Sequence, residues 1–340
     1  MDRPASTTTV IRGWRAASFV LLVAVIGCRL AEREMQDRTP QGCANCHTNI
    51  AAQWERSAHA IAWTDPEFIR ETEERSATDC LPCHASRPLL EQSPGEPAQL
   101  RDHERQFGIE CRTCHQLGEA YAGPHASRLG PHPVVEDAVR LPCSDFCGLC
   151  HQTEADEHAA LYLASAAGDQ RSCAQCHMPS YRERLTQGHV LSYIHPKRTV
   201  HNHAFPVWSP VVSAGAVEID RPAASHAAGQ PVEVALTLTN RGAGHRIPSG
   251  EFGYRKLRVA VELLDHAGQV IGQAEQAVFP GDPLSLAPGV PTTFRLPIAV
   301  TAGAPADRVR ILVERVNRDR SFQYTLAEGE WPIAELDAHE

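Results

Sequence analysis

One pattern, Cys-x-x-Cys-His, occurs five times between residues 43 and 177 and constrains this chain more than any other feature. The two thiols are spaced to reach the two vinyl groups of one porphyrin, and the adjacent imidazole can bind the iron. The cysteine pairs, numbered here as motifs 1 to 5, are Cys43 and Cys46, Cys80 and Cys83, Cys111 and Cys114, Cys147 and Cys150, and Cys173 and Cys176. The predicted proximal iron ligands are His47, His84, His115, His151 and His177. The pattern predicts five covalently attached c-type haems.

Two other uses of Cys-x-x-Cys pairs compete with this interpretation, namely zinc sites and redox disulfides. Zinc ribbons need no histidine directly after every second cysteine, and a thioredoxin-like motif occurs once, in a βαβ setting. Five copies that all carry the histidine therefore favour haem attachment over a zinc or disulfide array.

Length and composition agree with a haem protein of two domains. The chain has 340 residues, and aromatic residues make up only 6% of it. Five porphyrins would supply the large flat apolar groups that Phe and Trp normally provide. The formal net charge of -9 excludes nucleic acid as an expected partner and favours a redox protein with a basic patch around its own haem edge.

The N-terminus predicts export. Arg12 and Arg15 precede an apolar run at 16–27, which is too short to span a bilayer and suits the hydrophobic region of a secretory signal. The run ends at Cys28 and resembles the bacterial lipobox, in which signal peptidase cuts before the cysteine and the cysteine is then acylated. An ordinary signal peptide with an incidental cysteine remains the alternative, and both require export.

These features predict a lipoprotein-type signal peptide at 1–28 and a polar tether at 29–42. The tether could instead form the first helical turn of the haem domain. Arg29 after the acylated cysteine resembles lipoproteins that are sent to the outer membrane. We expect the protein on the periplasmic side of a bacterial membrane, held there by its lipid anchor.

Motif 1 continues into Trp54-x-x-Ser57-x-His59-Ala60, and motif 5 into Met178-Pro179. In these segments the chain resembles the multihaem cytochrome c family that includes the tetrahaem partner of hydroxylamine oxidoreductase. The resemblance implies that His59 is the distal ligand of a neighbouring haem. Residues 49–63 are rich in helix formers, and twelve continuous helical residues would place His59 about 18 Å from His47, too far to share one iron.

Further histidines follow the later motifs and are candidate distal ligands. His103 precedes motif 3, whereas His125 and His132 follow it on Gly- and Pro-rich backbone. His125 resembles the loop ligand of the family and is preferred to His132, although solvent exposure of either remains open. His189 and His203 follow motif 5, and His203 lies in a His-x-Phe segment that resembles another ligand segment of the family.

Two residues near motif 4 have no assigned haem role. Cys143 is left over after the motif cysteines and Cys28, and we favour an inert buried thiol over a reactive or intermolecular one. His158 follows His151 by two helical turns on the same side, so the two cannot hold opposite faces of one iron.

The composition changes near residue 209. No cysteine occurs from there to 333, and apolar and polar residues alternate at 232–239 and 257–263. A turn at 265–268 leads into Val270, and further strands are predicted at 294–296 and 309–316. We predict an α plus irregular haem-packed domain at 43–208 and a separate all-β, immunoglobulin-like sandwich at 209–335.

One loop of the predicted sandwich, residues 240–250, contains His245 in Gly-His-x-x-Pro-Ser-Gly. It resembles a loop found in cytochromes with this domain order, with Ser249 in place of Thr. Gly242 and Gly244 would allow close approach to a flat group. We expect His245 to reach a haem iron or its propionates, and a plain turn with a solvated histidine is the alternative.

Two functions from different classes fit the sequence. The first is electron transfer between redox partners through closely spaced bis-histidine haems. The second is a haem-dependent oxidoreductase with one open iron that acts on a small nitrogen or sulfur compound. None of the five motifs has Lys in place of the proximal histidine, the substitution that marks ammonia-forming nitrite reductases, so electron transfer is preferred.

Overall fold

The computed structural model describes residues 37–93, 95–126, 132–164, 170–187, 192–193, 195–206, 215–225, 231–250, 255–300, 305–317 and 323–333. The predicted signal peptide with Cys28, most of the predicted tether, and His189 lie outside the described residues. Within the described part of the chain, no helix is long and apolar enough to cross a membrane.

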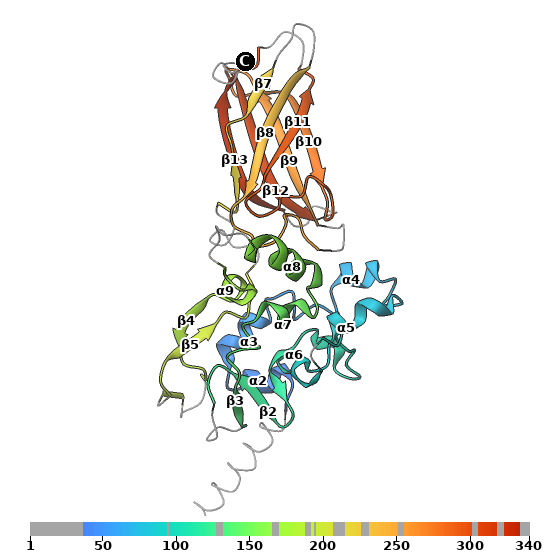
Figure 1. The fold of residues 1–340 in the computed structure, drawn as a ribbon, viewed down its shortest axis with the longest axis vertical. Coiled ribbons are helices and arrows are strands. Elements are labelled where there is room, and N and C mark those ends of the chain that lie inside the picture. Colours follow the sequence, from blue (N-terminus) through green and yellow to red (C-terminus); the bar gives the residue numbers. More distant parts are fainter. Residues whose placement is uncertain are drawn as a thin grey trace, which may run out of the picture. The chain divides into compact units, whose positions relative to one another are not determined.

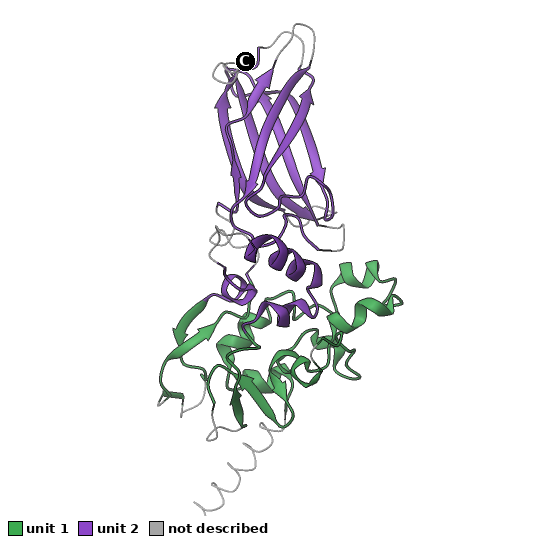
Figure 2. Ribbon diagram, in the orientation of Figure 1, with its two compact units in different colours: residues 1–141, 180–205 green, residues 142–179, 206–340 purple. Residues whose placement is uncertain are grey.

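The chain divides into two compact units (Figure 2). Unit 1 contains residues 1–141 and 180–205, and therefore motifs 1 to 3. Unit 2 contains residues 142–179 and 206–340, so motifs 4 and 5 belong to the same unit as the C-terminal strands. This division differs from the predicted boundary at 208/209, which assigns all five motifs to one domain.

Unit 1 consists of short helices, short strands and irregular segments (Figure 1). Its helices are α2 (Pro40–Ala44), α3 (Thr48–Trp54), α4 (Pro66–Glu71), η1 (Thr78–Cys80), α5 (Leu81–His84), η2 (Leu89–Glu91), η3 (Arg105–Phe107) and α6 (Cys111–His115). Its strands are β1 (Gln116–Leu117), β2 (Ala120–Gly123) and β3 (Val134–Glu136) in one sheet, and β4 (Ser180–Glu183) and β5 (Arg198–His201) in another.

Each haem motif contains a helical turn, which explains its spacing. Residues three and four apart share one face of a helix, so two cysteines at that spacing and the following histidine point to the same side. At motif 1 the His47 amide donates to the Cys43 carbonyl over 2.8 Å, and at motif 4 the His151 amide donates to Cys147 over 3.0 Å. Ser172 caps α9 (Cys173–His177) at motif 5 with a reciprocal pair of hydrogen bonds to Gln175.

The helix after motif 1 does not continue over residues 49–63, because α3 ends at Trp54. The Ser57 amide and hydroxyl both donate to the Trp54 carbonyl, over 2.8 and 2.7 Å, which replaces the next helical hydrogen bond by a tighter turn. The Trp54 indole also donates to the Ile109 carbonyl over 2.8 Å. The helical distance between His47 and His59 therefore does not apply.

Unit 2 begins with the helices of motifs 4 and 5. These are α7 (Ser144–Gly148), α8 (Gln152–Glu157), the π-helix η4 (His158–Leu163) and α9. The helix α8 begins directly after His151, which is its N-cap residue, and continues into η4. The segment between the motif 4 histidine and Leu163 is therefore helical throughout, first as an α-helix and then as a π-helix.

The C-terminal part of unit 2, called the β-domain here, contains only strands and loops (Figure 1). One sheet has the order β10-β9-β12-β13, and the other has the order β11-β8-β6, with β7 also paired to β8. The strands are β6 (Val217–Ile219), β7 (Ala223–Ser225), β8 (Val232–Asn240), β9 (Arg255–Leu264), β10 (Val270–Val278), β11 (Pro291–Ile298), β12 (Arg308–Asn317) and β13 (Gln323–Pro332). An all-β C-terminal region is thus confirmed.

The alternation in the sequence is what builds this β-domain. Val232, Val234, Leu236 and Leu238 are buried along β8, and the residues between them are partly exposed. Together with alternate residues of the other strands they form one core that both sheets share. The strands predicted at 232–239, 257–263, 294–296 and 309–316 are confirmed, as is the turn at 265–268.

Candidate haem-binding site

Three motif histidines lie opposite a second histidine that is distant in sequence. In unit 1 the ring centroids of His47 and His132 are 6.3 Å apart, and those of His115 and His203 are 6.0 Å apart. In unit 2 the centroids of His177 and His245 are 6.4 Å apart, and the rings are inclined by only 20°. Each pair joins one motif histidine to one histidine outside the motifs.

This separation suits a metal between the rings. Two imidazoles on opposite sides of one iron, each with a metal–nitrogen bond of about 2 Å, have centroids about 6 Å apart. Rings in direct stacking contact lie closer together. The stacked rings of His84 and Phe68, for example, have centroids 3.7 Å apart. The residues of the three pairs therefore fit bis-histidine ligation of haem iron.

Hydrogen bonds at Nδ1 orient five of the histidines concerned. Backbone carbonyls lie 2.7–2.8 Å from the Nδ1 atoms of these rings. The pairs of ring and carbonyl are His47 with Leu185, His84 with Ala62, His115 with Ala122, His203 with His201, and His245 with Arg246. A carbonyl can only accept, so Nδ1 carries the proton and Nε2 keeps its lone pair for a metal.

Burial favours the neutral form of four histidines of these pairs. It lowers the pKa of His177 and of His203 to about 4, and it lowers the pKa of His115 and His132 as well. A neighbouring imidazole contributes a smaller decrease to the pKa in each of the four cases. Neutral imidazole is the form that binds iron, so the pKa shifts and the hydrogen bonds favour the same state.

The structure selects among the predicted distal ligands. His203 and His245 lie opposite motif histidines, and so does His132, which the sequence favoured less than His125. In the described part of the chain, no ring contact joins His125 to a motif histidine. The side chain of His103 is 71% exposed and lies 4.0 Å from the Glu104 carboxylate.

His59 has a different neighbour. Its ring lies edge-on to Phe205, with centroids 4.3 Å apart, and its carbonyl accepts from the Ile109 amide over 2.9 Å. Phe205 also lies edge-on to His203, at 6.2 Å. His59 and His203 therefore contact the same aromatic side chain, and the His-x-Phe segment contributes its phenylalanine as well as its histidine.

The cysteines of different motifs approach one another. The side chains of Cys43 and Cys111 are hydrogen-bonded to each other in unit 1, and those of Cys147 and Cys173 are in unit 2. In a haem protein these sulfur atoms would be thioethers. Motifs 1 and 3 are thus adjacent, as are motifs 4 and 5. None of the eleven described cysteines is in a disulfide.

Cys143 and His158, the two residues without an assigned role, lie close to motif 5. Cys143 is the N-cap residue of α7 and is partly buried, and the next residue, Ser144, accepts from the Cys173 amide over 3.2 Å. His158 is buried, and its Nε2 lies 2.9 Å from the Arg171 carbonyl. Because His158 uses Nε2 in this bond, it differs from the five histidines whose Nδ1 atoms lie against a backbone carbonyl.

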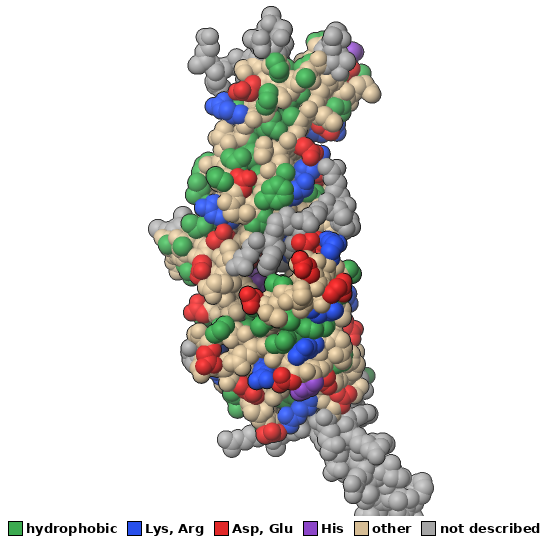
Figure 3. Space-filling view, turned by 90° about the vertical axis from the view of Figure 1, so that its right-hand side faces the viewer, with side chains coloured by type: hydrophobic (Ala, Val, Ile, Leu, Met, Phe, Trp, Pro, Cys, Tyr) green, Lys and Arg blue, Asp and Glu red, His purple; other side chains and the backbone are tan. Residues whose placement is uncertain are grey.

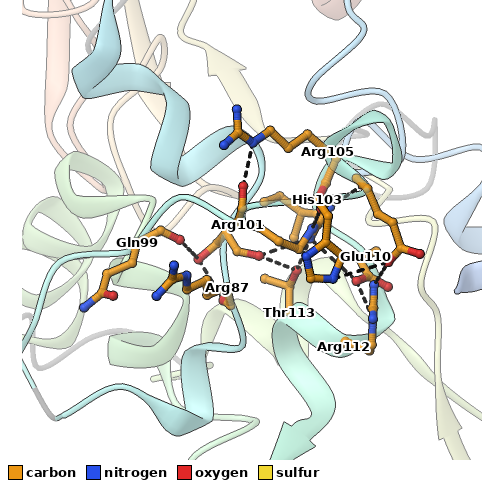
Figure 4. A network of polar contacts seen from close by, with 12 residues as sticks. Arg87, Gln99, Arg101, His103, Arg105, Glu110, Arg112 and Thr113 are labelled. Carbon is orange, nitrogen blue, oxygen red and sulfur yellow. Dashed lines mark hydrogen bonds and ion pairs between the residues drawn. The ribbon is translucent and has the colours of Figure 1, made fainter. Parts of the chain in front are cut away.

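A buried ionic network precedes motif 3 (Figure 4). Arg112 donates to Glu110 over 2.7 Å and also pairs with Glu104, while Arg101 lies 3.6 Å from Glu110. Arg101 also donates to the carbonyls of Ser86, Glu104 and Gly108. Burial raises the pKa of Glu110, which is only 2% exposed, and the two arginines oppose that increase. The network fixes the chain where it enters α6.

The features that sequence reasoning missed are mostly backbone atoms. The carbonyls that hold the Nδ1 atoms belong to Leu185, Ala62, Ala122, His201 and Arg246, and every residue type has such a carbonyl. No sequence signal could have identified them. Glu157 is a missed side chain, since it accepts two hydrogen bonds from the loop that carries His245.

Comparisons with known proteins agree with this site. The model of a family described as cytochrome c554 and c-prime matches residues 42–116, which contain motifs 1 to 3. A search of curated proteins found no match.

Among solved structures, the chain is similar to a penta-heme cytochrome c552 from Thermochromatium tepidum. The identity is 17%, the TM-score is 0.53, and the match covers 86% of this chain and 97% of that one. A putative ApaA protein from Bordetella pertussis matches 35% of this chain and 94% of its own, with 15% identity and a TM-score of 0.21. The family match and the cytochrome c552 fold support a multihaem c-type cytochrome with covalently bound haem.

Proposed function

We propose that this protein transfers electrons through c-type haems, five in number, that are ligated by pairs of histidines. The observation that carries the proposal is the set of three histidine pairs with centroids 6.0–6.4 Å apart. Haem iron carries one electron when it changes between its ferric and ferrous states. Two histidines per iron leave no open coordination position for a substrate. A carrier needs no open position, whereas an oxidoreductase that binds its substrate at the iron does.

The protein's residues would hold the iron in a fixed environment. Nδ1 hydrogen bonds to carbonyls stop the rings from turning, and they increase the basicity of the ligating nitrogen. His203 and His177 are partly buried, which limits access of water. The ligands are therefore expected to keep their positions in both oxidation states of the iron. Electron transfer would then require little rearrangement of the protein.

The contacts between motifs support a path from haem to haem. Attachment of porphyrins at Cys43 and Cys111 would place two haems next to each other in unit 1, and Cys147 and Cys173 would do the same in unit 2. Motif 2 would add a third haem to unit 1. The similarity to a protein described as a penta-heme cytochrome supports a count of five.

The β-domain takes part in this function through His245. In the proposal it supplies the distal ligand of the motif 5 haem, so it is more than a cover. The arrangement of its two sheets around one core supports an immunoglobulin-like sandwich.

We further propose that the protein is exported, anchored by lipid at Cys28, and located on the periplasmic side of the outer membrane. The apolar run at 16–27 that ends at Cys28 supports this. Redox proteins are its proposed partners, and the net charge of -9 favours a basic one. On the face shown in Figure 3, acidic and basic side chains are interspersed, so no single-sign patch on that face adds to the argument.

Low-temperature electron paramagnetic resonance of the oxidised protein tests the proposal, together with its intact mass. Electron transfer through bis-histidine haems predicts low-spin ferric signals throughout and a mass that exceeds the apoprotein by five haems. A high-spin signal equal to one haem would contradict the carrier function. It would favour the alternative, an oxidoreductase with one open iron for a small nitrogen or sulfur compound.

A further inference from the structure

The loop that carries His245 is shaped by a residue of its own β-domain. Asn240, at the end of β8, donates from Nδ2 to the His245 carbonyl over 2.8 Å and to the Leu286 carbonyl over 3.2 Å. Its Oδ1 accepts from the Ala243 amide over 2.9 Å. Asn240 is only 1% exposed. These bonds determine the conformation of the loop, but they do not connect it to the haem motifs.

The connection to the haem motifs comes from Glu157, the last residue of α8. Its Oε2 accepts from the Arg246 amide over 2.9 Å and from the Ser249 hydroxyl over 2.7 Å. Its Oε1 lies 3.9 Å from the Arg246 guanidinium. The carboxylate thus holds the loop at two points that follow His245 directly, and its side chain is 19% exposed.

Other residues of α8 and η4 also pack closely against the loop that carries His245. A Cβ atom on Gly244 would lie 2.9 Å from the His158 ring and 3.3 Å from Tyr162, both on η4. A Cβ atom on Gly250 would lie 3.2 Å from the Glu154 carboxylate. Residues 244 to 250 therefore lie along one helical segment, and the glycines allow the close approach that the Glu157 hydrogen bonds require.

We propose that Glu157 is a positioning residue that holds His245 opposite His177. The inference rests on the proposed function, in which these two histidines ligate the motif 5 iron. The bonds to the amide of Arg246 and to the hydroxyl of Ser249 are short, at 2.9 and 2.7 Å, and come from two points of the loop. The helix α8 begins directly after its N-cap residue His151, so Glu157 links the motif 4 histidine to the distal ligand of the next haem.

The Glu157 carboxylate could act on the loop through its charge, by an ion pair with Arg246, or as a hydrogen-bond acceptor. The proposal assigns it the second role. A surface ion pair with Arg246 would contribute little, because solvent screens it. Two hydrogen bonds to neutral donors instead define a position, and an amide oxygen can accept both. Glu157→Gln should therefore retain the function, and Glu157→Ala should lose it.

The test compares four variants of the full-length holoprotein. These are Glu157→Ala, Glu157→Gln, His245→Ala, and Asp156→Ala as the matched control, since Asp156 is an exposed carboxylate of the same helix. The readouts are the ferric spin state and the fraction of haem that binds carbon monoxide after reduction. Loss of both hydrogen bonds should raise that fraction at one haem by about tenfold or more in Glu157→Ala. Glu157→Gln and Asp156→Ala should match the wild type.

Each other outcome has a defined meaning. If His245→Ala yields a high-spin haem but Glu157→Ala remains low-spin, the positioning role is overturned and the ligand assignment stands. If His245→Ala itself matches the wild type, both the ligand assignment and this inference fail. If Glu157→Gln behaves like Glu157→Ala, charge rather than hydrogen bonding acts, and the proposal is wrong.

Ser249→Ala provides a milder variant in case Glu157→Ala yields no holoprotein. It removes one of the two hydrogen bonds and leaves the carboxylate in place. A smaller rise in carbon monoxide binding at one haem, absent in Ser249→Thr, supports the proposal. An unchanged fraction in Ser249→Ala overturns it.

Discussion

The β-domain and the haem-binding segments bury their side chains in different ways. The largest fully buried side chains of the described residues all lie between 234 and 311, within the β-domain. In unit 1 the buried apolar residues are scattered, as with Trp54, Phe68 and Leu89, and two buried residues, Arg101 and Glu110, are charged. The β-domain can therefore fold around its own core, whereas the haem segments need porphyrins to complete theirs.

Removal of one haem from unit 1 should produce the largest difference between unit 1 and the β-domain. We expect Cys111→Ala with Cys114→Ala to lower the intact mass by one haem and to expose amides of unit 1 to rapid hydrogen exchange. The amides of β9 and β12 should stay protected, because the core around them is formed by residues of the β-domain itself. Unchanged protection in unit 1 would show that its fold does not depend on this haem. Cys143→Ser is the control, and we expect it to keep haem content and spectra intact.

Loss of a distal ligand in unit 1 should change one haem without unfolding the unit. In His203→Ala the iron held by His115 would keep one protein ligand, so one haem should become high-spin and bind carbon monoxide. Electron paramagnetic resonance and carbon monoxide titration measure this. His103→Ala is the matched control, because that side chain is 71% exposed, and it should leave both measurements unchanged. A fully low-spin His203→Ala protein would refute the pairing with His115.

A cavity in the β-domain should lower stability and leave the spectra of unit 1 unchanged. Leu263 in β9 is fully buried, so Leu263→Ala should lower the free energy of unfolding of the β-domain by about 2–5 kcal/mol. Val270→Ala, at a side chain 45% exposed, should cost less than about 0.5 kcal/mol. Denaturant unfolding monitored by far-ultraviolet circular dichroism and by haem absorbance separates the two effects. Simultaneous loss of haem ligation in unit 1 would contradict the independence of the two cores.

A surface ion pair of the β-domain should have the smallest effect. Arg295 lies 3.2 Å from Glu233 across β11 and β8, and the side chains are 67% and 47% exposed. Arg295→Ala should change the free energy of unfolding by less than about 1 kcal/mol, since solvent screens such pairs. Denaturant unfolding at low and high salt measures it. A change of several kcal/mol would mean that charge contributes to this core as it does around Glu110 in unit 1.

The strands of the β-domain were predictable because apolar and polar residues alternate along them. The alternation arises because one face of each sheet meets the core and the other faces solvent. In β8 and β9 every second residue enters the core, and a period of two is visible in the sequence. The strand β13 (Gln323–Pro332) was not predicted. It is paired only with β12, at the edge of its sheet, and its residues alternate between exposed and partly buried, so its apolar signal is weak.

The helix after motif 1 shows the opposite case, in which local propensity was overridden. Helix formers continue past Trp54, yet the serine at position 57 takes the carbonyl that the next helical turn needs. The preference for His125 over His132 has a similar cause. Both lie on irregular backbone, and only the paired strands β2 and β3 determine which of the two is brought to His47.

The sequence by itself determined the five Cys-x-x-Cys-His motifs and from them predicted the proximal histidines, because two thiols and an imidazole at fixed spacing are a local chemical unit. It also determined the strands whose alternation faces a core. The tertiary structure alone decided which histidine lies opposite which, since each pair joins residues that are far apart in the chain. It also decided that Glu157 holds the His245 loop, and that motifs 4 and 5 belong to the unit of the β-domain. Those contacts depend on distances between segments, and residue type along the chain does not encode them.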